Sequence, residues 1–427
     1  MMSVQAFFGS LVQFGLIAGL FVAGPFLLFF LSTTYAEHLE ARGKYHQSYR
    51  FSRAVYYFTD IPLLRLWIGK FHYLQLRALS ERAAKIGNQT AALDWLRDAS
   101  DARFSSSERV HALAQLATLL RKQNRTGEAE AAETEALAIV PDRTRRKERF
   151  TLSDEDGAST RSAQAGILTG QGRFAQALAL LDQSSTPDLY RTPLIFTAQR
   201  STIFRYLGRY DEAIAEYVRH AQEWAELTDK ILSRSTSNTV VDARIHESFQ
   251  DYDAITVLPG VELYLEAGQT EAASELWSRL PVAASPTTRA LRHAVGAWLS
   301  AVRGDRDAAK SQMTQAESAP IRDETTRHTV SHTLARAESA MQDYPRAAER
   351  WESLVQNSAH TPLAKAEYRV SLAASYAQMG RVADARVQYE QVIAAGFEEA
   401  VFTQKARAEL SGLPADSPDA DADSDAS

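Results

Sequence analysis

The sequence predicts an all-α protein built as an array of stacked helix pairs, and two observations carry the prediction. The first is a repeat: alanines recur five residues after turn-like positions, and most intervals between those positions are 36 to 38 residues. The second is composition: 45% of the 427 residues are hydrophobic, glycine and proline are sparse, and no β-type alternation stands out. A fixed period of this length is typical of arrays of paired helices.

Each copy of the repeat follows the same packing logic. The turn positions are Gly87, Asn124, Gly172, Gly208, Gly268, Gly304, Gln342 and Gly380. The alanines that follow them, which we expect at the contacts between helices, are Ala92, Ala129, Ala177, Ala213, Ala273, Ala309, Ala347 and Ala385. Residues seven before each turn are mostly small, and residues nine after it are bulky except at Glu133. Small side chains facing bulky ones allow dense packing, and a glycine tolerates the left-handed backbone where a helix stops.

The best copies resemble the tetratricopeptide repeat. They are Gly208-Arg209-Tyr210-Asp211-Glu212-Ala213 through Tyr217, Gly380 through Tyr389, and 172–177. The resemblance covers residues 62–410 and implies a right-handed α-solenoid that binds proteins or peptides. The aromatic residue expected two positions after the turn is missing at Gln89, Thr126, Thr270 and Arg306, so those copies fit generic paired-helix repeats equally well. A plain helical bundle is the alternative architecture.

Residues 6–31 form an uncharged apolar run that predicts a single transmembrane helix behind a short N-terminus, residues 1–5. As a helix the run reaches about 39 Å, against about 30 Å of hydrocarbon. A cleaved signal peptide is the alternative, but it needs a basic start and a shorter apolar stretch. Gly15, Gly19 and Ala23 recur at every fourth residue, a spacing that favours association of membrane helices into a homo-oligomer, although glycine is also common in such helices.

The charges that flank the apolar run predict its orientation. No Lys or Arg precedes it, and Arg42, Lys44, Arg50 and Arg53 follow it. The positive-inside rule places the repeats in the cytoplasm at a bacterial inner membrane, with a periplasmic location as the alternative. Residues 32–61 are basic and aromatic. They fit a lipid-contacting segment, a degenerate first repeat that caps the array, or both.

Two insertions interrupt the period, near residues 141–160 and near residues 221–256. The first holds a basic cluster that fits either a contact for an acidic partner or phosphate groups, or a solvated loop or helix start. Its residues are Arg143, Arg145, Arg146, Lys147 and Arg149. Insertions in repeat arrays often border the binding face. The acidic segment 411–427 is too polar to bury a core, so we expect it to be disordered.

The sequence does not indicate catalysis. It has no cysteine, which excludes disulfides and thiolate chemistry, and no phosphate-loop, nucleophile-elbow or zinc-protease motif. His328 and His332 have the spacing of a zinc pair, but without a third ligand we expect a solvated helix face. Scattered carboxylates on helices are likewise expected to face solvent. Without the tail the chain is near neutral, which disfavours nucleic-acid binding.

These observations predict a non-enzymatic scaffold without cofactors, anchored in the membrane, that recruits partner proteins to an inner-membrane assembly. Similarity to anchored repeat proteins suggests envelope biogenesis, secretion or polysaccharide export as the setting. The first alternative is a periplasmic-facing chaperone that holds unfolded clients. The second is a structural role, in which the chain self-associates through its membrane helix and the array is a spacer.

Overall fold

The computed structural model describes residues 33–40, 42–59, 62–101, 104–140, 153–183, 192–234, 256–280, 285–321, 324–357 and 360–414. In these ranges the chain is helical and contains no strand. The predicted membrane helix 6–31, with Gly15, Gly19 and Ala23, lies outside them, as does the chain from residue 415 onward. Among the helices inside these ranges, none combines the length and the apolar character that crossing a bilayer requires.

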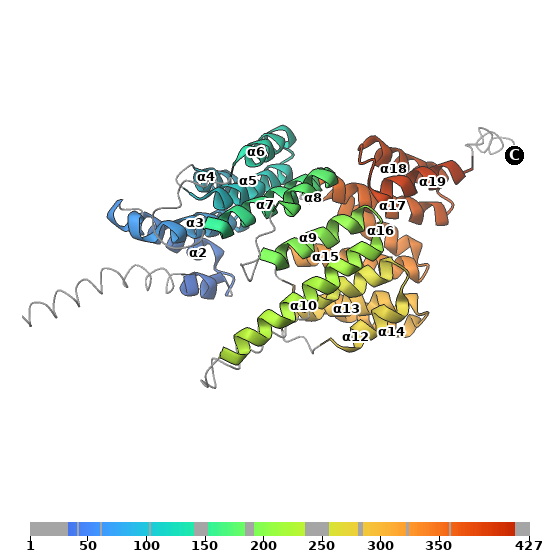
Figure 1. The fold of residues 1–427 in the computed structure, drawn as a ribbon. Helices are drawn as coiled ribbons and strands as arrows, with labels where there is room; N and C mark the ends of the chain where they lie inside the picture. Colours follow the sequence, from blue (N-terminus) through green and yellow to red (C-terminus); the bar gives the residue numbers. More distant parts are fainter. Residues whose placement is uncertain are drawn as a thin grey trace, which may run out of the picture. The chain divides into compact units, whose positions relative to one another are not determined.

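The helices follow one another in pairs (Figure 1), each pair joined at one of the turn positions. The pairs are α3 (Pro62–Lys85) with α4 (Gln89–Ala99), α5 (Ser106–Lys122) with α6 (Thr126–Ala138), α7 (Ser153–Gly170) with α8 (Phe174–Asp182), α9 (Thr192–Tyr206) with α10 (Tyr210–Arg234), the helix at 256–266 with α12 (Thr270–Ser278), α13 (Pro286–Val302) with α14 (Arg306–Ser318), α15 (Glu324–Ala340) with α16 (Tyr344–Gln356), and α17 (Pro362–Gln378) with α18 (Val382–Ala394). A last helix, α19 (Val401–Gly412), follows them. The fold is therefore an all-α array of helix pairs.

The turns inside the pairs share one backbone conformation. All eight predicted turn residues have positive φ, from +58° at Asn124 to +81° at Gly304, which confirms the left-handed turn expected there. At Gly380, for example, the next N–H, that of Arg381, donates to the carbonyl of Tyr376 at 2.9 Å. This hydrogen bond satisfies a carbonyl that the end of a helix leaves open. Gln342 adopts the same conformation without being glycine, at a cost of about 1–2 kcal/mol.

The eight repeat alanines all lie in the core, each with no exposed surface. The bulky residue of the same pattern is also buried in most copies, as at Trp351 and Tyr389, and Trp277 is partly buried. The exception, Glu133, is 6% exposed, and its carboxylate accepts a hydrogen bond from the Arg121 guanidinium. An ion pair thus occupies the position that a bulky apolar or aromatic side chain fills in the other copies.

The segment that precedes α3 is also helical, over 33–40 and in α2 (Tyr45–Thr59). Glu40 accepts hydrogen bonds from Arg82 and Lys85 of α3, at 2.7 and 2.6 Å. Trp95 of α4 donates to the hydroxyl of Tyr49, which is 6% exposed. This segment therefore packs on the first pair of the array.

The insertions differ from simple loops where the structure describes them. The second helix of the fourth pair, α10, runs on to Arg234, so residues 221–234 extend a helix. Helix α7 starts at Ser153, so residues 153–160 are also helical. Residues 141–152 and 235–255, and with them the basic cluster 143–149, lie outside the described ranges.

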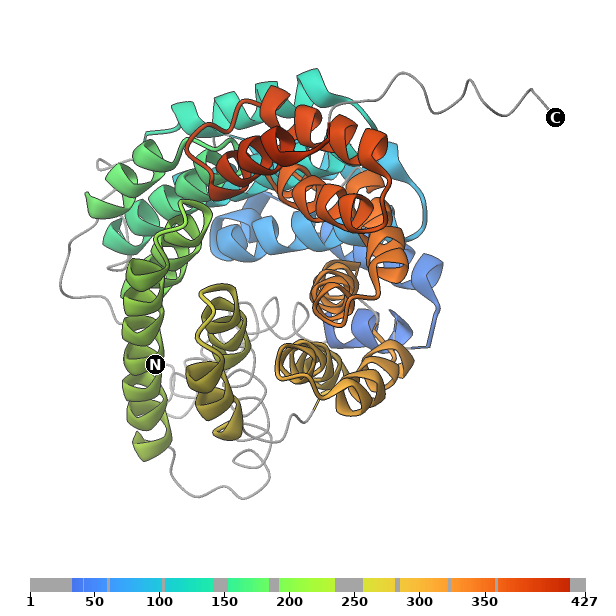
Figure 2. The same ribbon diagram turned by 90° about the vertical axis from the view of Figure 1, so that its right-hand side faces the viewer.

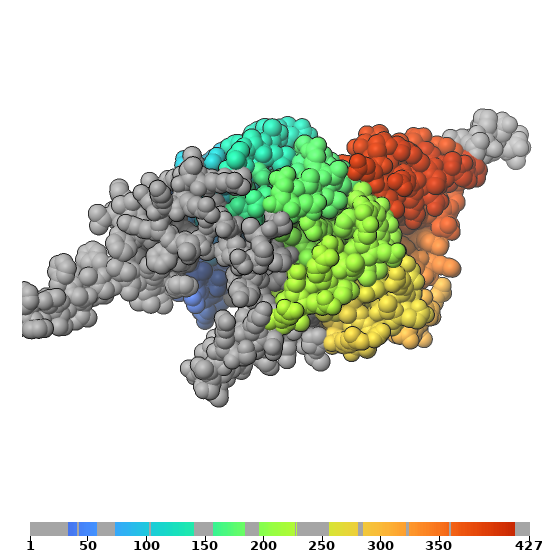
Figure 3. All heavy atoms as spheres, in the orientation of Figure 1, coloured from blue at the N-terminus to red at the C-terminus, as the bar shows by residue number. Residues whose placement is uncertain are grey.

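The chain divides into an N-terminal unit, residues 1–163, and a C-terminal unit, residues 164–427. In the C-terminal unit the last helices return to the first ones. Gly172 lies so close to Phe397 that a Cβ atom there would be 2.4 Å from the ring, and Gly208 meets Val401 in the same way. The rings of Tyr206 and Phe402 are in contact, with centroids 6.4 Å apart. Figures 2 and 3 show the red C-terminal helices beside the green helices α8 and α9, so the helix pairs of this unit close into a ring.

Candidate functional site

Four charged side chains meet on the inner face of this ring, each from the first helix of a different pair. Arg205 comes from α9, Glu266 from the helix at 256–266, Arg336 from α15 and Glu367 from α17. Arg205 Nη1 donates to Glu367 Oε1 at 2.9 Å and to Glu266 Oε1 at 3.1 Å. Arg336 donates to Glu367 at 3.1 Å and also pairs with Glu266. We call these residues the charge quartet. It ties α9 to α17, across 162 residues of sequence.

The quartet is largely shielded from water, with side chains 12 to 22% exposed. Burial acts to raise the pKa of Glu266, but the guanidinium groups of Arg205 and Arg336 outweigh it, so that this pKa is lowered. The same balance lowers the pKa of Glu367. Each carboxylate therefore stays ionised between two cations. Arg336 also makes a cation–π contact with Trp298, in which its guanidinium carbon lies 4.9 Å from the ring centroid.

A pocket of about 590 Å³ opens beside the quartet. We call it the inner-face pocket. This volume lies within the range of about 300–1,000 Å³ usual for ligand sites. Its lining comes from α9, α10, the helix at 256–266 and α15, and consists of Ala198, Gln199, Ser201, Thr202, Arg205, Tyr217, His220, Thr256, Pro259, Glu262, Leu263, Glu266 and His332. A partly apolar wall with a few charged groups is the usual composition of a binding site.

Glu262 is the second carboxylate of this pocket, one helical turn before Glu266. It accepts a hydrogen bond of 2.6 Å from the hydroxyl of Thr333 on α15. Burial raises the pKa of Glu262, and the Thr333 hydrogen bond and the charge of Arg336 only partly oppose this effect. Within the described ranges, no Lys or Arg side chain lies within ion-pair distance of Glu262. The carboxylates of one helix thus have opposite pKa shifts, because only Glu266 contacts the guanidinium groups.

His332 also lines the pocket, and the expectation of a solvated face at His328 and His332 was wrong for this residue. The His332 ring packs against Trp351 of α16 and Tyr368 of α17, at centroid distances of 5.4 and 5.3 Å. Burial, helped by the charge of Arg336, lowers the pKa of His332 well below its usual value, so the imidazole is neutral. His328 lies 2.6 Å from the amide nitrogen of Asn357. In the described ranges, no three His, Asp or Glu side chains are placed to hold a metal ion.

The inner-face charges are residues that reasoning from sequence missed, since carboxylates on helices were expected to face solvent. For two of these charges, Glu262 and Arg336, a signal was present in the spacing. Glu262, Trp298 and Arg336 each lie six residues before the turn residue of their pair, so the repeat places them at equivalent positions on successive first helices. Polar residues at that position are therefore candidates for the inner face.

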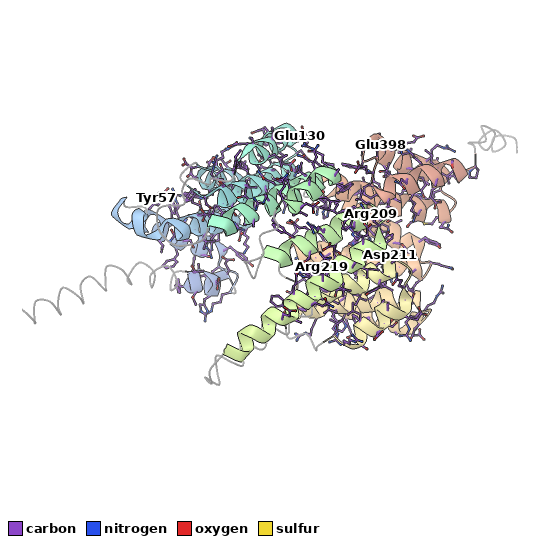
Figure 4. All side chains as sticks on the ribbon, in the orientation of Figure 1. Tyr57, Glu130, Arg209, Asp211, Arg219 and Glu398 are labelled. Atoms are coloured by element: carbon purple, nitrogen blue, oxygen red, sulfur yellow. The ribbon has the colours of Figure 1, made fainter. Side chains whose placement is uncertain are left out.

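The residues singled out from the sequence lie elsewhere. The repeat alanines pack between helices and do not reach the pocket. Arg42, Lys44, Arg50 and Arg53 are exposed at the start of α2 and along it. Of these, Arg53 stacks on the exposed ring of Tyr57, 5.4 Å from its centroid, and Tyr57 is labelled in Figure 4.

No protein-family model matches the chain, and no curated protein sequence matches it. Solved structures do. The chain is similar to a tetratricopeptide repeat protein from Parabacteroides merdae, at 14% identity and a TM-score of 0.36, over 79% of this chain and 97% of that one. It is also similar to the Cut9–Hcn1 hetero-tetramer of the APC/C, at 9% identity and a TM-score of 0.30, over 89% and 96% of the two chains. A third is Ton1535 from Thermococcus onnurineus, at 14% identity and a TM-score of 0.31, over 89% and 99%.

Proposed function

We propose that this chain is a membrane-anchored scaffold whose repeat array binds a partner protein and holds it at a membrane assembly. The inner-face pocket of the C-terminal unit carries the binding part of the proposal. It is a preformed space of about 590 Å³ that combines an apolar wall with charged groups from two helix pairs. A cavity built in this way is suited to a ligand that has both apolar and charged parts. The resemblance to the tetratricopeptide repeat favours a protein or peptide as that ligand.

The anchoring part of the proposal is based on the apolar run 6–31, which is long enough to cross a bilayer as a helix. The fold supplies a fixed point directly after it: Ala36 is fully buried, and the ring of Tyr35 contacts Phe51 at 4.9 Å. A partner bound to the array is thereby kept near the membrane. Envelope biogenesis, secretion and polysaccharide export are the settings in which we place such an assembly.

A truncation that starts at Thr33 separates binding from anchoring, since it keeps Tyr35 and Ala36. We expect the truncated protein to stay helical by circular dichroism and to retain the partner of the full chain in stoichiometric amounts after washing in high salt. We expect that partner to leave the membrane fraction. A truncated protein that folds but no longer binds the partner contradicts the proposal. Suppressed aggregation of many unrelated clients, without a stoichiometric partner, indicates the chaperone instead.

The charge bias around the apolar run leads us to propose a cytoplasmic array. A reporter that is active only in the cytoplasm, fused after Pro414 so that α19 stays intact, should be active. A reporter that is active only outside the cytoplasm should be silent at the same position. The reverse pattern refutes the cytoplasmic location and favours the periplasmic chaperone.

A further inference from the structure

The charges that border the inner-face pocket do not balance. In the charge quartet two guanidinium groups face two carboxylates, so its formal charge is zero. Glu262 adds a third carboxylate to the same region, and its hydrogen bond from Thr333 supplies no positive charge. Among the described residues, the charges around the pocket therefore leave one negative charge in excess when Glu262 is ionised.

A second polar side chain lies in the same wall of the pocket. His332 directly precedes Thr333 on α15 and lines the same pocket. Its Nε2 atom is shielded from water, and no hydrogen-bond partner for that atom exists among the described residues. A buried polar atom without a partner costs free energy, and a neutral imidazole nitrogen without a proton accepts a hydrogen bond. Glu262 thus offers a charged acceptor to a donor that enters the pocket, and the imidazole of His332 lies in the same wall.

The remaining wall suits the rest of such a ligand. Ala198, Pro259 and Leu263 supply apolar surface to the pocket, and Tyr217 supplies a ring. Lysine and arginine side chains combine an alkyl stem that packs on apolar surface with a charged end that carries only donors. The alkyl stem of either residue therefore fits the apolar wall of the pocket, and its charged end fits the Glu262 carboxylate.

We propose that the inner-face pocket binds a basic side chain, the ammonium of lysine or the guanidinium of arginine, with Glu262 as its counter-ion. This inference depends on the proposed function in that the partner protein carries the basic residue. A free alkylamine shares the same chemistry. The quartet stays intact on binding, because its own charges are already compensated.

Peptide binding to the full chain in detergent tests this assignment. The probes are acetyl-Ala-Ala-Lys-Ala-Ala-amide and the same peptide with norleucine, which keeps the alkyl stem and lacks the ammonium. We expect the lysine peptide to bind at least about tenfold more tightly, as a charge-assisted hydrogen bond implies. Equal binding of the peptides, or no lysine-dependent binding, overturns the proposal. n-Butylamine that displaces the lysine peptide at equal concentration identifies the site as one for free amines; failure to displace it identifies a site for a peptide segment.

Glu262→Gln provides the residue-level test, because glutamine still accepts the Thr333 hydrogen bond and only the charge is lost. The matched control is Glu271→Gln, which removes one charge from an exposed position in the first turn of α12. We expect Glu262→Gln to lose the preference for lysine over norleucine and Glu271→Gln to keep it. Equal effects of these substitutions refute the assignment. If the Glu262→Gln protein retains its partner protein undiminished, the scaffold function stands and the basic-side-chain site falls.

Discussion

Replacing Arg336 by methionine is expected to lower the free energy of unfolding of the C-terminal unit by about 3 kcal/mol. The substitution removes one of the two cations that hold Glu266 and Glu367 ionised in a place largely closed to water. Breaking a buried ion pair costs about 3–5 kcal/mol, and the residual exposure of 12 to 16% favours the low end of that range. The loss should appear as an earlier urea transition by circular dichroism.

Arg209→Met is the matched control for this prediction. Arg209, labelled in Figure 4, pairs with Glu212 and also lies over an aromatic ring, that of Phe204. Both members of its pair are 49% exposed, so we expect a change within about 1 kcal/mol. A cost for Arg336→Met as small as that of the control would show that the quartet does not stabilise the ring.

The stability of the quartet also depends on pH. The pKa of Glu266 and that of Glu367 are lowered from 4.5 in the folded chain. The stability that these ionised carboxylates contribute is therefore complete above their pKa in the unfolded chain. It is lost as the pH falls through their lower pKa values in the folded chain. The difference in free energy of unfolding between the wild-type protein and the Arg336→Met variant should accordingly become smaller in acid. A gap that widens below pH 4.5 contradicts this account.

Replacing Phe397 by alanine is expected to cost about 3 kcal/mol, the low end for a buried phenylalanine. Phe397 is 9% exposed and packs between Gly172 and the ring of Phe402. Both contacts belong to the region in which the last helices meet the first helices of the C-terminal unit. Urea unfolding followed by circular dichroism measures the loss.

A double-mutant cycle with Gly172→Ala assigns this loss to closure of the ring. Gly172 and Gly268 have nearly the same φ, +72° and +73°, but a Cβ at Gly268 meets nothing within 4 Å. Each alanine costs about 1–2 kcal/mol for the left-handed backbone, and Gly172→Ala should cost about 1–3 kcal/mol more because it overpacks. That excess should vanish when Phe397 is alanine. Equal costs at Gly172 and Gly268 in the wild-type background would mean that the ring is open in solution.

The parts of the fold that depend on neighbouring residues could be predicted from the sequence. At Gly380, for instance, the helix ends with two hydrogen bonds, from the Gly380 N–H to the Ala377 carbonyl and from the Arg381 N–H to the Tyr376 carbonyl. Ala385 packs where the repeat pattern places it. Such features recur at a fixed spacing because each copy of the repeat packs its two helices in the same way. The spacing therefore predicts helices, turns and core alanines together.

The inner face could not be predicted in this way, because its contacts depend on how far the array curves. Arg205 and Glu367 are 162 residues apart in sequence. They meet only because the last helix pairs of the C-terminal unit pack against the first helix pairs of the same unit. Likewise, His332 was expected on a solvated face because Trp351 and Tyr368, which cover it, come from other helices. Nothing in the helix that carries Arg205 or His332 indicates these neighbours.

The closure of the C-terminal unit has a consequence for how the protein is made. In most repeat arrays each repeat contacts only its neighbours, so that folding can begin at any repeat and propagate. Here Gly172 contacts Phe397, which lies 225 residues later in the chain (397 − 172). At about 5–20 residues per second, synthesis of that stretch takes about 11–45 s. During this time Arg205 and Glu266 lack Glu367, and the surfaces that later meet stay in water. Contacts of such large sequence separation slow folding, so this unit completes its fold only after its last helices have been made.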